Sequence, residues 1–373
     1  MTRNPTTVPP APLARPTLLP GLRRIWRDRH RLQLGVDPAR AVTVQLPDAG
    51  TARLLDLLDG TRSERTVIAH AARCGIGEPD ARALLATLRA AGLVVGAQTL
   101  LPHNLPDPVR RRLADEAAAL ALRTAPAGGP AGTPGGSARH RGAGPASPTT
   151  PATILRRRSA ARVVVAGHGQ LTVPVSVALA QAGVGHVSPA LEPPTTRDAP
   201  PPPEAGPTSR RLAEAVRRAA PGTRTGPVHR RDASFVVQVG AVGPANLAAA
   251  GYARHRLAHL AVSVRDGTPV IGPLVPPSGA PCLNCVDLHR RDRDPGWPGL
   301  AAQLALPGHD PCAAASVLTA AGLATGEVLA WLDGETPTTL GASVEVIGPG
   351  QLRRRSWPPH PRCPCLRRRP ARR

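Results

Sequence analysis

The sequence contains no lysine, and its aromatic residues amount to four Trp, one Tyr and one Phe in 373 residues. Without lysine, the chain has neither the phosphate-binding lysine of a P-loop nor the Schiff-base lysine of a pyridoxal enzyme. With so few aromatic side chains, it also has little material for the stacking platforms that bind single-stranded nucleic acid. These absences exclude two enzyme classes and argue against one class of nucleic-acid binding.

Arginine supplies all the fixed positive charge of the side chains, and the formal net charge is +22. Such a balance is typical of proteins that bind nucleic acid or acidic peptides. Arginine in place of lysine, together with heavy use of Ala, Gly and Pro, is also typical of a GC-rich coding bias. We favour the coding bias, and we do not expect nucleic acid as a partner.

The N-terminal segment is interrupted by prolines and lacks the apolar stretch of an export signal. We find no apolar window that reaches the length of a membrane span, so no membrane partner is expected. The sequence therefore predicts a cytoplasmic protein, in which paired cysteines bind metal more often than they form disulfides.

Segments rich in proline and glycine divide the chain into parts. Residues 1–24 lack the periodicity of a core and are predicted to be disordered. Residues 102–153 are predicted to be a helix followed by a Pro/Gly-rich linker. The compact parts are then residues 25–101 and residues 154–373, the latter interrupted by a second proline-rich stretch at 189–207.

The first compact part has a legible order of elements. Two apolar runs between Leu32 and Leu46 predict a β-hairpin. Helical spacing follows at 51–58, then a helix with Ser63 as its N-cap, then a helix over 78–91. An extended run at 93–95 completes the pattern. Two strands, three helices and a final strand predict a winged-helix domain.

This part resembles the PqqD-like recognition domains, which bind the leader of a ribosomally made precursor peptide as an added strand. The resemblance implies that the hairpin is the docking edge, with Leu32, Leu34, Val42 and Val44 as the peptide-docking residues. A winged helix that binds DNA is the alternative for the same pattern.

A Rossmann-like unit begins at the apolar run from Arg162 to Ala166, which is typical of a buried parallel strand. Gly167, Gly169 and Thr172 then occupy the places of the three glycines in a nucleotide-binding loop. A helix and a second strand follow. Thr172 replaces the last glycine, and neither the second strand nor the later strand at 234–239 is followed directly by an acid.

Four cysteines form two close pairs, Cys282 with Cys285 and Cys363 with Cys365. Two such pairs predict a structural zinc site with a closed tetrahedral shell, and a disulfide or redox pair is the alternative. Cys312 precedes an apolar helix predicted at 313–332. At a helix N-terminus its pKa would be lowered and it would be a candidate for thioester formation, but we favour a small packed residue.

Three segments together resemble the ThiF and ubiquitin-activating-enzyme superfamily over residues 154–365: VVVAGHGQLTVPVSVALAQAGVGHV, HLAVSVRDGTPVIGPLVPPSGAPCLNCVDLHR and the final HPRCPC. Members adenylate the C-terminal carboxylate of a small carrier protein, using ATP and magnesium. The resemblance implies an α/β protein with a ThiF-type Rossmann domain and structural zinc. The altered loop and the missing acids argue against ATP as a working cofactor.

A PqqD-like domain joined to a ThiF-like domain with these cysteines is similar to the leader-binding partners of YcaO-type cyclodehydratases. The resemblance implies that the chain binds a precursor leader peptide and presents it to a YcaO enzyme that forms azolines. It also implies a homodimer formed through the Rossmann domain. The alternatives are an active adenylyltransferase and a winged-helix DNA-binding regulator.

Overall fold

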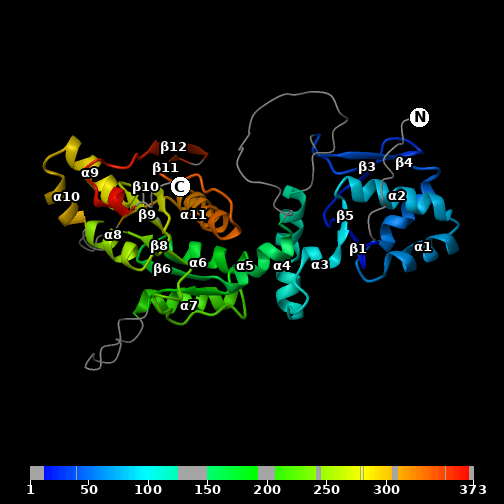
Figure 1. The fold of residues 1–373 in the computed structure, drawn as a ribbon, viewed down its shortest axis with the longest axis horizontal. Helices are drawn as coiled ribbons and strands as arrows, with labels where there is room; N and C mark the ends of the chain where they lie inside the picture. Colours follow the sequence, from blue (N-terminus) through cyan, green and yellow to red (C-terminus); the bar gives the residue numbers. More distant parts are fainter. Residues whose placement is uncertain are drawn as a thin grey trace. The chain divides into compact units, whose positions relative to one another are not determined.

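The structure is a computed structural model that describes residues 12–38, 40–124, 149–191, 206–240, 245–277, 279, 281–304, 310–348 and 350–368. Contacts within the chain divide it into two compact units, residues 1–155 and 156–373, and each is described by itself (Figure 1). Most of the two linkers predicted from composition lies outside the described residues.

The N-terminal unit contains a three-stranded antiparallel sheet in the order β2-β3-β4, formed by β2 (Arg24–Trp26), β3 (Arg31–Leu34) and β4 (Val42–Gln45). The pairing of β3 with β4 confirms the predicted hairpin. The remaining elements of this unit are η1 (Ala49–Leu57), α1 (Glu64–Arg73), α2 (Glu78–Ala90), β5 (Val94–Gly96), α3 (Ala97–Leu100) and α4 (Asp107–Thr124).

The predicted disorder of residues 1–24 is wrong for the part that the structure describes. Pro16–Leu18 forms strand β1, which is buried and pairs antiparallel with β5. Leu19, the next residue, is buried as well. A strand of three residues is too short to show a period of two, and its partner lies far along the chain, so the sequence pattern gave no signal.

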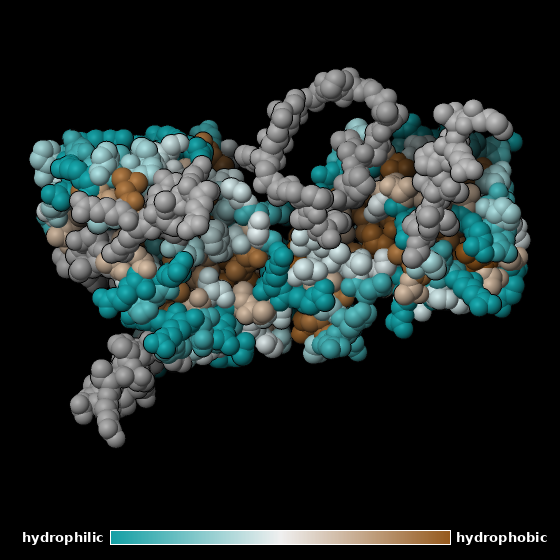
Figure 2. Space-filling model, in the orientation of Figure 1, coloured by the Kyte–Doolittle hydropathy of each residue, from teal (hydrophilic) through white to brown (hydrophobic). Residues whose placement is uncertain are grey.

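A hydrophobic core joins the three-stranded sheet of the N-terminal unit to its helices. Leu32 and Leu34 of β3 pack in the same cluster as Leu54 of η1 and Leu88 of α2. Ser63 caps α1, because its hydroxyl accepts a hydrogen bond from the Thr66 backbone N–H at 3.1 Å, as its position before the helix predicted. On the face shown in Figure 2, hydrophilic side chains are interspersed with hydrophobic ones.

The C-terminal unit is built on a seven-stranded mixed sheet in the order β12-β11-β10-β9-β8-β6-β7. Strands β7, β6, β8 and β9 run parallel, whereas β9, β10, β11 and β12 are joined by antiparallel pairings. The strands are β6 (Arg162–Gly167), β7 (His186–Ser188), β8 (Phe235–Val239), β9 (His259–Arg265), β10 (Thr268–Val275), β11 (Ala342–Gly348) and β12 (Gln351–Ser356). The predicted α/β class and the parallel βαβ unit are confirmed.

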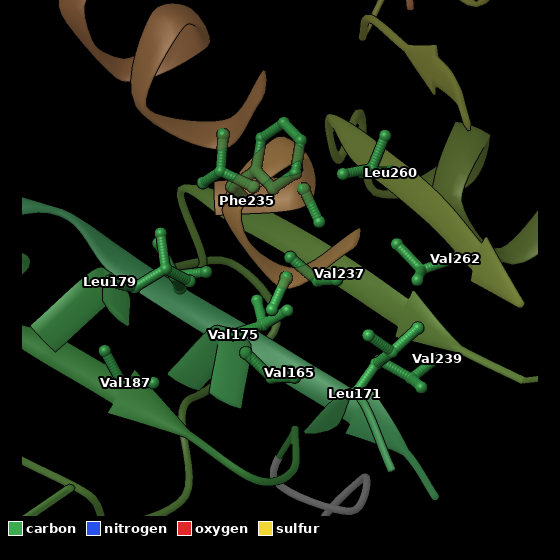
Figure 3. Packing of buried hydrophobic residues seen from close by; sticks show 14 of the residues in the cluster. Val165, Leu171, Val175, Leu179, Val187, Phe235, Val237, Val239, Leu260 and Val262 are labelled. Carbon is green, nitrogen blue, oxygen red and sulfur yellow. The ribbon is translucent and has the colours of Figure 1, made fainter. Parts of the chain in front are cut away.

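Helices cover both faces of this sheet, as expected for buried parallel strands. The elements are α5 (Pro151–Ala160), α6 (Thr172–Gln181), α7 (Pro207–Ala219), α8 (Ala245–Arg254), α9 (Leu283–Arg293), α10 (Trp297–Leu304), α11 (Ala314–Asp333) and η2 (Pro364–Arg368). Figure 3 shows Leu171 and Val175, at the start of α6, packed over Val165 of β6 and Val237 of β8. This packing fixes the turn between β6 and α6.

The expectation that no segment is long and apolar enough to span a membrane is wrong by length and composition for α11. In the structure, Val317, Ala320, Ala324 and Val328 of α11 belong to the hydrophobic core beneath the sheet. A core helix passes the same test as a membrane span, so α11 is weak evidence for a membrane partner.

A buried ion pair holds the base of the parallel half of the sheet. The Arg158 guanidinium donates to both carboxylate oxygens of Asp333, at 2.9 and 2.6 Å, and to the Ala182 carbonyl oxygen at 3.1 Å. Both side chains are almost completely buried. The pair therefore joins α5 to the ends of α6 and α11, and removal of either partner would leave an uncompensated buried charge.

Candidate functional site

The glycine loop lies where the sequence placed it, between β6 and α6. Gly167 and Gly169 have φ angles of 108° and 121°, which favour glycine. A Cβ atom on Gly167 would lie 1.9 Å from the Val239 carbonyl oxygen, whereas on Gly169 the nearest atom would be a Val239 methyl carbon at 3.9 Å. Gly167 is thus required by the close approach of β6 and β8, with or without a nucleotide.

The N-terminus of α6 offers few donors for a phosphate. Thr172 is the first helical residue, and its backbone N–H donates to the Gly169 carbonyl oxygen at 3.3 Å. Pro174 follows two residues later and has no N–H. Phosphate binding at helix N-termini depends on free N–H groups in this turn. Pro174 therefore weakens the loop further, a feature visible in the sequence that the glycine pattern alone does not reveal.

The third place of the loop is filled by a buried side chain. Thr172 is almost completely inaccessible, and its hydroxyl oxygen has no hydrogen-bond partner among the described residues. The side chain occupies space that a glycine would leave free. A nucleotide site would have a ribose-binding or metal-binding acid at the end of β7. Here Ser188 ends the strand, and its hydroxyl donates to the Ala190 carbonyl oxygen at 2.7 Å.

One acid near the loop was not foreseen. Asp310 lies far along the chain, but its carbonyl oxygen accepts a hydrogen bond from the Gln170 side chain at 3.5 Å. It also lines the same pocket as Gly240 at the end of β8. Only the fold brings it there, so no local sequence signal marks it.

The four predicted zinc ligands converge. The Sγ atoms of Cys282, Cys285, Cys363 and Cys365 all lie within 4.8 Å of one another. The separations include 3.6 Å from Cys282 to Cys363 and 3.4 Å from Cys285 to Cys365. A tetrahedral zinc ion with Zn–S bonds of about 2.3 Å would separate the sulfur atoms by roughly 3.8 Å. The cluster therefore has the size and the donor set of a four-thiolate metal site.

The electrostatics of the cluster also fit a cation. Hydrogen bonding between the two thiols lowers the pKa of Cys285 to about 4 and raises the pKa of Cys282. Burial and then the neighbouring thiols raise the pKa of Cys365 to about 12. Four packed thiols thus resist joint ionisation, and a bound divalent cation would supply the charge that stabilises all four thiolates.

A second layer of contacts positions the C-terminal cysteine pair. His360 is buried, and its Nε2 atom lies 2.8 Å from an Asp292 carboxylate oxygen. The Asn284 amide donates to Cys363 Sγ at 3.2 Å. His289 lies with its Nε2 atom 2.9 Å from the Pro358 carbonyl oxygen, and its ring contacts the His360 ring. Such contacts orient metal ligands.

Cys312 does not have the environment of a nucleophile. Burial raises its pKa, so the lowering expected at a helix N-terminus is wrong. Its Sγ atom lies 3.6 Å from the Gly267 carbonyl oxygen, and the side chain packs against the main core. The favoured interpretation, a small packed residue before α11, agrees with these contacts.

The side chains assigned to peptide docking need a correction. Leu32, Leu34 and Val44 are buried in the core, and Val42 packs against it, so these side chains support the sheet from inside. β3 is also the central strand of its sheet, so its backbone is paired on both sides. The open edges of the sheet are β2 and β4, and a docked strand would meet one of these backbones.

A pocket of about 240 Å³ lies over the antiparallel half of the large sheet. Strands β9, β10 and β11 form its floor, and helices α9 and α10 contribute its walls. Its polar side chains include Arg265, Asp287, Arg290 and Glu345, and Trp297 and Trp357 supply aromatic surface. None of these residues was identified from sequence as part of a site, because they come from four separate elements and the segment after β12.

No protein-family model matches the chain, and no curated protein matches it. Solved structures do. Microcin C7 biosynthetic enzyme MccB in complex with N-formylated MccA is 13% identical with a TM-score of 0.56, covering 94% of this chain and 99% of that chain. E. coli MccB with ATP is 12% identical with a TM-score of 0.55, covering 94% and 99%.

The heterocyclase TruD is 12% identical with a TM-score of 0.56, and the match covers 94% of this chain but 42% of TruD. The chain therefore shares its fold with MccB and with the matched part of TruD. At such low identity the likeness concerns the fold. It carries neither the activity nor the ligands of MccB or TruD to this chain.

Proposed function

We propose that this chain binds the leader of a ribosomally made precursor peptide and presents it to a separate YcaO-type enzyme that forms azolines. The observation that carries the proposal is the contrast within the C-terminal unit, where the four-cysteine site is complete and the nucleotide loop is not. A fold that offers few hydrogen-bond donors to a phosphate is suited to binding a peptide rather than to adenylating one.

The comparisons support a peptide as the ligand class. MccB has been solved in complex with N-formylated MccA, and TruD is a heterocyclase. Both match 94% of this chain, including its N-terminal unit. Residues 25–101 of the N-terminal unit would act as a winged-helix, PqqD-like domain, and the zinc site would hold the C-terminal segment in place. We propose that the leader peptide docks on β4, an edge strand of the three-stranded sheet in the N-terminal unit.

The absence of working ATP chemistry is tested by calorimetry of the full zinc-loaded chain with magnesium and ATP, followed by ATP–pyrophosphate exchange. No binding by a folded, zinc-loaded protein is the expected result. Exchange above background would overturn the proposal and establish an adenylating enzyme. Asp310 favours that second candidate, because it lines the pocket and its carbonyl oxygen accepts a hydrogen bond from Gln170 of the glycine loop, and Asp310→Asn would then abolish the exchange.

Peptide docking is tested by hydrogen–deuterium exchange of the full chain with and without a synthetic leader peptide of an azoline-forming system. Strand addition protects edge amides, so protection is expected at Val42–Gln45 of β4. Protection at Arg24–Trp26 of β2 instead would overturn the assigned edge. Unchanged exchange throughout residues 12–100, at saturating peptide, would contradict leader binding by this unit.

A further inference from the structure

The pocket over the antiparallel half of the sheet contains two arginines with unusual surroundings. Arg265 ends β9, and Arg290 comes from α9. Burial lowers the pKa of Arg265. Burial, followed by repulsion from Arg265, lowers the pKa of Arg290 to about 10. Two guanidinium groups are thus held near each other and partly away from water, an arrangement that an anion would stabilise.

Three acidic residues line the pocket, Asp287, Asp310 and Glu345, and two of them have other close partners. Glu345 pairs with Arg353 and Arg355 of β12, the latter at 2.6 Å. Asp287 accepts a hydrogen bond from the Trp297 indole N–H at 2.7 Å. Within the part of the chain that the structure describes, no carboxylate lies within ion-pair distance of Arg265 or Arg290.

The Arg290 guanidinium is held in position by aromatic rings. It lies 4.8 Å from the centroid of Trp297 and 5.9 Å from that of Trp357. Stacking of this kind restrains a guanidinium plane and leaves its N–H edge free to bind a carboxylate. The start of α9 is fixed in turn by Cys282 and Cys285, so the four-cysteine cluster positions Arg290 for the pocket.

Size decides between classes of anionic ligand. The pocket volume of about 240 Å³ is below the roughly 300–1,000 Å³ of sites for drug-sized molecules, so a whole nucleotide is a poor fit. Apolar side chains, including Val262, Val264 and Val270, line the rest of the space. An acidic side chain with apolar neighbours matches both the volume and the lining.

We propose that this pocket is a second peptide-binding site, in which Arg265 and Arg290 bind a carboxylate carried by an extended peptide. The inference rests on the proposed function, since it assigns a further contact of the same peptide to the C-terminal unit. The carboxylate is an aspartate or glutamate side chain, and a free C-terminus offers the same chemistry from another source.

The test is a tryptophan fluorescence titration of the full zinc-loaded chain, because Trp297 and Trp357 line the pocket. The probe is acetyl-Ala-Leu-Glu-Leu-Ala-amide, and its glutamine counterpart is the control peptide. We expect the glutamine peptide to bind at least about tenfold more weakly, as for the loss of a hydrogen bond to a charged group. A glutamine peptide with a free C-terminus distinguishes the terminal carboxylate from the side chain.

Arg290→Gln and Arg265→Gln should each weaken binding of the glutamate peptide by about tenfold or more. Arg291→Gln is the matched control, since Arg291 is an exposed neighbour on α9 that does not line the pocket. Its effect should be less than about twofold. Thermal melting and zinc content of each variant verify the fold. Because two arginine variants are tested, the inference can still be tested if one of them does not fold.

Equal binding of the glutamate and glutamine peptides, binding of neither, or unchanged binding by both pocket variants would overturn the inference. Inorganic pyrophosphate that binds and displaces the peptide would also overturn it, in favour of a phosphate site. If the pocket does not bind the glutamate peptide while the leader peptide still slows amide exchange in β4, only this inference is contradicted. If the pocket binds its peptide and β4 is never protected, the proposed leader function fails instead.

Discussion

The four-cysteine cluster and the glycine loop belong to the same unit, yet one is complete and the other is depleted. The cluster brings four thiols within 4.8 Å and adds contacts from Asn284 and His360. The loop has a threonine in its third place and a proline in the first turn of the helix that follows. The difference supports our proposal of a binding scaffold, since four thiols converge as metal ligands would while the loop lacks its third glycine.

The sharpest way to break this comparison is to remove a cluster ligand. Cys363→Ser should abolish stoichiometric zinc binding and destabilise the C-terminal unit by several kcal/mol, because binding of structural zinc contributes on the order of 10 kcal/mol to folding in small zinc domains. Metal analysis and thermal melting measure both effects. Cys74→Ser is the control, because Cys74 is exposed at the end of α1 and distant in chain from the cluster. Full zinc occupancy in the Cys363 variant would contradict the assignment.

The two loop glycines offer the next largest effect. Gly167→Ala should cost more than about 3 kcal/mol of unfolding free energy, because strain at positive φ adds to a clash with the Val239 carbonyl oxygen. Gly169→Ala meets no close atom and should cost about 1–2 kcal/mol from backbone strain alone. Chemical denaturation of both variants measures the difference. Equal costs would show that close packing of β6 on β8 is not what requires Gly167.

The pH dependence of stability distinguishes the contribution of the cysteine cluster from that of the large sheet. Burial lowers the pKa of His259, at the start of β9, from 6.5 to about 4. The unfolded state therefore binds its proton first, so stability is full above pH 6.5 and falls as the pH drops from 6.5 to 4. The loss is about 3 kcal/mol. Protonation of the thiolates also releases metal in acid.

The histidine contribution is isolated by measuring denaturation against pH for zinc-loaded and chelator-treated protein. His259→Asn keeps a donor for the Leu257 carbonyl oxygen, which His259 Nδ1 approaches at 3.1 Å. This variant should flatten the decline between pH 6.5 and 4 in both preparations. A slope that disappears on chelation alone would assign the whole acid sensitivity to the cluster.

Sequence patterns predicted the parts of this molecule whose signals are local. The βαβ unit follows from RVVVAG and the helix after it, and the hairpin of β3 and β4 follows from the two apolar runs between Leu32 and Leu46. The cysteines were found because their spacing is informative in itself. Strand β1, Asp310 and the Arg265–Arg290 pocket were missed, because each depends on pairing between distant segments.

The smallest expected effect is the most direct test of how depleted the loop is. Thr172→Gly restores the third glycine and removes a buried hydroxyl that has no partner among the described residues. ATP binding should stay undetectable by calorimetry, because Pro174 still lacks an N–H and no acid follows β7 directly. The matched variant, Thr172→Gly with Pro174→Ala, adds the missing donor. If Thr172→Gly alone bound ATP, the loop would be one substitution from function, and the contrast with the zinc cluster would be much weaker than the structure indicates.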